Sequence, residues 1–137
     1  MSRTLVAACA LALAGVAHAA DDCAARLKAP RAMQARGGGY TVAFAPRPAP
    51  LATGRHFALD IAVCPDRGVM APKSIQVDAD MPAHRHGMNY RATVAARGDG
   101  LYRAEGLLLH MPGRWRFIFD LALDGRNERL THEVEVP

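Results

Sequence analysis

Apolar residues recur at every second position in most segments of this chain, and this pattern constrains the fold more than any other feature. In the segment 57–63 the residues on one face are Phe57, Leu59, Ile61 and Val63. In the segment 115–123 they are Trp115, Phe117, Phe119, Leu121 and Leu123. A period of two is typical of a β-strand with one face buried. Glycine and proline interrupt the chain every few residues, so no helix is expected.

Seven segments combine this alternation with turn residues at both ends. The expected strands span residues 40–44, 57–63, 74–80, 88–97, 101–110, 115–123 and 130–136. Short strands at regular spacing, separated by turn signals, are typical of a two-sheet sandwich. The sequence therefore predicts an all-β protein with an immunoglobulin-like β-sandwich of about seven strands.

The fourth and fifth predicted strands are separated by Asp99 between two glycines, which indicates a hairpin. A two-residue turn would pair residues whose numbers sum to 199, and a three-residue loop would give 198. Only the sum of 198 sets one apolar face against the other, and a slip by one residue would turn one set outward. The expected pairs are Tyr90 with Leu108, Ala92 with Gly106, Val94 with Ala104, and Ala96 with Tyr102. In this register Met88 would lie opposite His110.

The first nineteen residues have the organisation of a secretory signal peptide. Arg3 precedes an apolar run over 5–16, and Ala17-His18-Ala19 has the small-x-small pattern that signal peptidase cleaves. The run is shorter than the roughly 20 apolar residues that span a bilayer. We therefore expect residues 1–19 to be removed, leaving a periplasmic protein with no membrane span.

The remaining 118 residues (137 minus 19) suit one domain. Residues 20–39 lack a clear strand pattern and are expected to be an N-terminal lead-in, with the sandwich spanning 40–137. The net charge of +4 is scattered along the chain without a basic block, which argues against nucleic-acid binding.

Two cysteines, Cys23 and Cys64, follow the predicted leader. In an oxidising compartment such a pair indicates a disulfide. The alternative is that one thiolate is a metal ligand. Neither cysteine lies in a Cys-x-x-Cys or Cys-x-His context, which favours the disulfide.

Histidines and methionines are concentrated around the predicted hairpin. Residues two apart in an extended backbone direct their side chains to the same side. The hairpin register would add residues from the facing strand end. The six residues expected to gather at one rim of the sandwich are Met81, His84, His86, Met88, His110 and Met111.

This combination of side chains favours copper. A thioether is a soft ligand that suits Cu(I), and imidazole binds Cu(I), Cu(II) and Zn(II). Zinc sites are built from Cys, His and carboxylate rather than Met. Cu(I) is thus the better fit than Cu(II). The alternative is that the methionines fill gaps in the core and that the rim is a metal-free contact surface for another exported protein. No nucleophile paired with a base is visible, so the chain is not expected to be an enzyme.

The ordered motifs are Met81-Pro-x-x-His84-x-His86-Gly-Met88, Gly100-x-Tyr102-Arg-Ala-Glu-Gly106 and His110-Met111-Pro-Gly-x-Trp115. Together they resemble the YtkA-like domain, which is similar to FixH-type and CopC-like periplasmic proteins. The resemblance covers roughly residue 40 to the C-terminus. It implies an immunoglobulin-like sandwich in the periplasm that handles copper or assists respiratory-oxidase maturation. From the His/Met site we expect a protein that holds copper or passes it to another periplasmic or membrane-bound copper protein.

Overall fold

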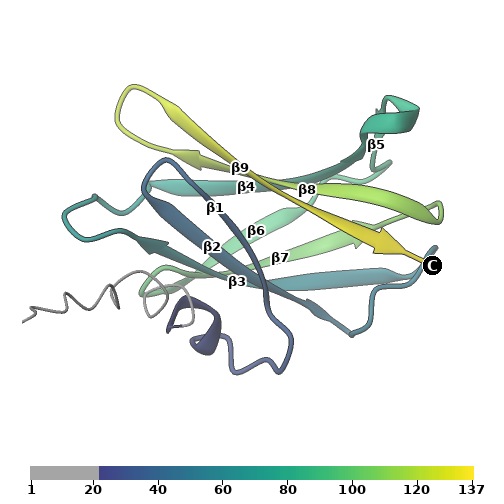
Figure 1. The fold of residues 1–137 in the computed structure, drawn as a ribbon, viewed down its shortest axis with the longest axis horizontal. Coiled ribbons are helices and arrows are strands. Elements are labelled where there is room, and N and C mark those ends of the chain that lie inside the picture. The colour runs from purple at the N-terminus through teal and green to yellow at the C-terminus, as the bar shows by residue number, and fades with distance from the viewer. Residues whose placement is uncertain (1–21) are drawn as a thin grey trace, which may run out of the picture.

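Two antiparallel β-sheets pack face to face in the computed structural model, which describes residues 22–137 (Figure 1). The first sheet has the order β1-β2-β3-β7-β6 and the second the order β5-β4-β8-β9. The strands are β1 (Met33–Gly37), β2 (Tyr40–Arg47), β3 (His56–Pro65), β4 (Ser74–Met81), β5 (His86–Gly87), β6 (Thr93–Gly98), β7 (Leu101–Leu108), β8 (Gly113–Ala122) and β9 (Asn127–Val136). The short 3-10 helix η1 (Pro82–His84) lies between β4 and β5. The predicted β-sandwich is confirmed.

The core forms where the alternating apolar faces of the two sheets meet. The side chains predicted to be buried on β3, and those on β8 up to Leu121, are each at most 6% exposed. Phe44 of β2 packs against Phe117 and Phe119 of β8, with ring centroids 5.4 and 4.8 Å apart. Leu123, just past the end of β8, is only half-buried.

The N-terminal lead-in contains a strand that the sequence analysis did not predict. β1 pairs with β2 along its whole length, from Met33 opposite Phe44 to Gly37 opposite Tyr40. On its other side β1 packs beside β9, where His132 Nδ1 lies 2.7 Å from the Gln34 carbonyl oxygen. Only Ala35 of β1 is buried, so the segment has no alternating apolar pattern that would reveal it.

The β6–β7 hairpin has the predicted register over part of its length. Val94 pairs with Ala104 and Ala96 with Tyr102, so the sum of 198 is confirmed, and a bulge follows at Gly98. The strand, however, starts at Thr93 rather than at residue 88. Residues 86–87 pair with β4 in the other sheet. The predicted strand over 88–97 is therefore wrong in its first half, because this part of the chain crosses from one sheet to the other.

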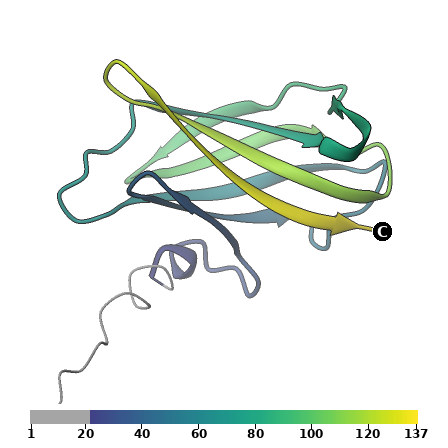
Figure 2. The same cartoon turned by 45° about the horizontal axis from the view of Figure 1, so that its top comes forward.

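The N-terminal part of the described chain is fixed to the outer face of the first sheet. Cys23 lies in a helical turn over residues 22–25 and forms the predicted disulfide with Cys64. This turn lies against the outer face of the first sheet (Figure 2). Cys23 is 1% exposed and packs on Ala43 and Ala62. The predicted signal peptide, residues 1–19, lies outside the described residues. Among residues 22–137, no helix is long and apolar enough to cross a membrane.

Candidate metal site

A tight chain reversal at one end of the sandwich places the first two candidate histidines. η1 begins directly after β4, at Pro82, and its backbone is closed by the Arg85 N–H, which donates to the Pro82 carbonyl at 3.3 Å. Arg85 has a left-handed backbone, with φ 55° and ψ 36°. This conformation turns the chain back so that β5 pairs with β4, with His86 opposite Met81.

Three of the six predicted residues form a row of imidazole rings at this end. The ring centroids of His84 and His86 are 5.7 Å apart, and those of His86 and His110 are 5.1 Å apart. His84 is exposed, whereas His86 and His110 are half-buried. η1 and β5 therefore supply two rings, and the turn between β7 and β8 supplies the third.

The spacing of these rings suits a shared ion. A metal ion is bound by imidazole nitrogen at roughly 2.0–2.1 Å, which separates the centroids of two rings on one ion by roughly 5–6 Å. Both neighbouring pairs fall in this range. Within residues 22–137, however, no group of three or more His, Cys, Asp or Glu side chains is already placed to hold a metal ion. Binding would need the rings to turn or a methionine to complete the set.

The two half-buried histidines differ in their hydrogen bonds. His86 Nδ1 lies 3.3 Å from the Gly87 carbonyl oxygen, so a proton on Nδ1 leaves Nε2 as the ligand atom. A backbone carbonyl commonly fixes the tautomer of a metal-binding histidine in this way. His110 Nδ1 is buried and has no hydrogen-bond partner among the described residues. A buried polar atom without a partner is costly, and a bound metal would satisfy it.

Trp115 forms the inner wall of this row of rings. Its indole is fully buried and meets His110 and His86 edge to face, with centroids 5.4 and 6.0 Å apart. Its Nε1–H donates to the Met111 carbonyl at 3.0 Å. The sequence analysis assigned Trp115 to the core and to the motif that ends the family resemblance, but not to the site. The signal for such a role was its place in that motif, four residues after Met111, which allows the side chain to reach back to the turn.

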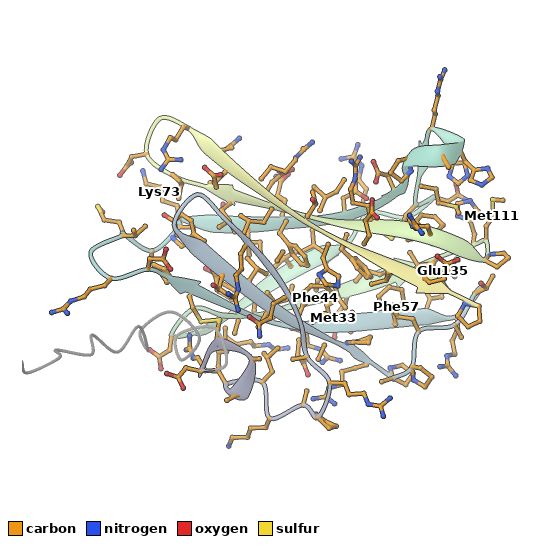
Figure 3. The ribbon with its side chains drawn as sticks, viewed as in Figure 1. Met33, Phe44, Phe57, Lys73, Met111 and Glu135 are labelled. Atoms are coloured by element: carbon orange, nitrogen blue, oxygen red, sulfur yellow. A yellow bond between two sulfur atoms is a disulfide. The ribbon has the colours of Figure 1, made fainter. Side chains whose placement is uncertain are left out.

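Two candidate methionines lie close to the rings. Met81 is 2% exposed, and its methyl carbon lies 3.2 Å from where a Cβ on Gly113 would be. The Met81 side chain thus extends from β4 toward the β7–β8 turn and fills the space left by Gly113. Met111 is half-buried in that turn, at the same end of the sandwich as η1 and β5 (Figure 3).

Met88 is not where the sequence analysis placed it. Its N–H donates to the Ala79 carbonyl at 3.1 Å, so Met88 continues the short β4–β5 ladder and does not lie opposite His110. Its side chain packs against the core, on the same side as Ala79. The expected pairing with His110 is wrong because β6 does not extend this far. Among residues 22–137, the two histidines not assigned to the site have other contacts: His132 contacts β1, and the exposed His56 packs against Tyr90.

Together, these features define a small antiparallel β-sandwich with a row of imidazoles, lined by methionine and tryptophan, at one end. The chain belongs to the YtkA-like family, whose model matches residues 34–120. The match starts within β1, earlier than the resemblance at residue 40 suggested, and covers all six candidate residues. No curated protein and no solved structure shows a significant match to the chain.

Proposed function

We propose that this protein binds copper at the rim, preferring Cu(I) to Cu(II), and holds it or passes it to a partner. His84, His86 and His110 supply imidazole nitrogens, and Met81, Met88 and Met111 are the candidate thioether ligands. The proposal rests on one observation above the others. The Nδ1 of His110 is buried without a hydrogen-bond partner among residues 22–137, and its ring centroid lies 5.1 Å from that of His86.

The donor set supports storage or transfer rather than catalysis. All six ligands are neutral when they bind, so the site needs no thiolate, and a soft thioether favours Cu(I). His84 is exposed at the outer end of the row, whereas Met81 is buried at the inner end. A partner can therefore exchange ligands with the outer end first. Another exported copper protein, free in the periplasm or bound to the membrane, is the partner we propose.

The test of this function is a competitive Cu(I) titration of the mature protein under anaerobic conditions. Trp115 is the only tryptophan, and its ring packs against two of the proposed ligands. We expect one equivalent of Cu(I) to quench its fluorescence with high affinity. Zn(II) should bind much more weakly, because thioethers add little for zinc. Equal affinities for the two metals would contradict the preference for copper. No Cu(I) binding would contradict the proposal altogether and favour a metal-free contact surface.

We propose that the protein works outside the cytoplasm, after its leader is removed. The Cys23–Cys64 disulfide supports an oxidising compartment. We expect the protein expressed with residues 1–19 in a Gram-negative host to lose them, which intact-mass measurement of the periplasmic fraction will detect. Changing Ala17 and Ala19 to bulky residues should block cleavage. Full-length protein that stays with the membrane in the unaltered chain would contradict this prediction.

A further inference from the structure

One side of the sandwich is closed by two neighbouring strands, and the other side is open. On one side β1 packs directly beside β9. On the other, a groove of about 570 Å³ separates β4 from the segment that leads into β6. One wall is β4 from Ser74 to Asp78, and the other includes Met88, Tyr90 and Val94. The groove thus begins beside the candidate metal site and continues along the open side of the molecule.

The β4 wall of this groove is an unpaired strand edge. Ala79 directs its carbonyl toward β5, where it accepts from the Met88 N–H. The N–H and C=O groups of alternate residues in a strand point to the same side, so those of Val77 and Ile75 also point into the groove. Within residues 22–137, no strand pairs with β4 on this side beyond Ala79. Asp78 ends the ladder, because its Oδ1 accepts the Ala79 N–H at 2.8 Å.

We propose that the β4 edge is a docking site for an extended segment of a partner protein, which adds a strand beside Ile75 and Val77. Exposed sheet edges bind extended peptides in this way through main-chain hydrogen bonds, with alternate side chains giving specificity. This docking does not require copper. If the proposed metal function is also correct, the added strand would end next to the metal-binding rim.

The groove walls indicate the chemistry of that segment. Side chains of the added strand that face inward would meet apolar Ile75, Val77 and Val94. Those that face outward would meet Asp78, which is exposed and forms no ion pair among the described residues. Asp120 also lines the groove, but its carboxylate is already paired with Arg129. The basic residue of the lining, Arg91, belongs to the opposite wall, whereas Asp78 lies on β4 itself, where the added strand would pair. The segment that fits is one in which apolar residues alternate with basic residues.

The experiment uses metal-free protein and a capped seven-residue probe peptide in which lysine alternates with valine. Amide hydrogen exchange measured by NMR reports directly on the backbone amides of the β4 edge. We expect the peptide to slow exchange of the Ile75 and Val77 amides by about tenfold or more, while the Ala79 amide, which Asp78 already caps, changes little. A peptide with alternate N-methylated backbone amides should not protect them. No binding at millimolar peptide, or protection confined to other strands, would overturn the proposal.

A matched pair of variants tests the role of charge. Asp78→Asn removes the carboxylate but keeps an oxygen that can cap the Ala79 N–H, so folding should be preserved. Asp99→Asn makes the same charge change in the β6–β7 turn, where the left-handed φ of 52° suits asparagine. We expect several-fold weaker peptide binding for the first variant and wild-type binding for the second. Equal binding by both variants would overturn the proposed preference for basic residues.

Discussion

Replacing His84, His86 and Met88 together by alanine is expected to abolish high-affinity Cu(I) binding. This change removes both rings supplied by η1 and β5 and the methionine that follows them. Loss of outer-shell partners alone typically lowers metal affinity by roughly 10–100-fold, so removing direct ligands should cost more. The measurement is the competitive titration described above, made on the triple variant and on His110→Ala. The His110→Ala variant should bind Cu(I) much more weakly than wild type, because the buried Nδ1 of His110 is a proposed ligand atom.

The two histidines outside the site among residues 22–137 supply the controls for this series. His56→Ala and His132→Ala should leave Cu(I) affinity unchanged. His132 contacts the Gln34 carbonyl of β1, so its loss should lower stability without affecting the site. Wild-type affinity in His110→Ala would show that the ligand assignment is wrong. Wild-type affinity in the triple variant would contradict the copper function itself.

Removing the Cys23–Cys64 disulfide by a double change to alanine should cause the largest loss of stability. The bridge closes a loop with a sequence separation of 41. The chain-entropy relation for a loop of this length gives about 4 kcal/mol. For a domain of this size that loss lowers Tm by more than about 10 °C. Thermal unfolding monitored by circular dichroism measures this change in Tm.

Thiol chemistry provides an independent check on the same bridge. Unfolded, unreduced wild-type protein should take up no alkylating label. The His56 end of β3 lies near the rim, because His56 pairs with Leu108, and Cys64 is near the other end of this strand. The double variant should therefore keep its Cu(I) affinity. Two added labels in the wild type would show free thiols. Loss of copper binding in the folded double variant would make a cysteine a candidate ligand.

The sequence predicted the sheets better than the connections between them. β3 and β8 were predicted because buried faces impose strict alternation, and the β6–β7 register followed because only one alignment matches two apolar faces. β1 has a single buried residue, Ala35, and is held by β2 and β9, so no local pattern marks it. His86 and Gly87 pair with β4 because the chain reverses at Arg85, which has a left-handed backbone. Tertiary contacts, not a local sequence pattern, determine this conformation.

The candidate site was predicted in composition but only partly in geometry. The row of His84, His86 and His110 forms through contacts between η1, β5 and the β7–β8 turn, not through the hairpin ladder that suggested it. The roles of Trp115 and Gly113 depend on how side chains fill space between the sheets. Periodicity places such residues on a buried face, but it does not show which neighbour each of them contacts.

The direction of β9 determines where another polypeptide can be attached without disturbing measurements at the rim. β9 ends at Val136 opposite Gly113, so the C-terminus lies next to the candidate site. A polyhistidine tag after Pro137 would therefore place competing imidazoles beside the proposed ligands. Cys64 is near the far end of the ten-residue strand β3, roughly 26 Å from the His56 end of that strand, which lies near the rim. A tag at the Cys23 side of the mature chain is thus the suitable choice, whereas a fluorescent reporter fused after Pro137 would sense events at the rim.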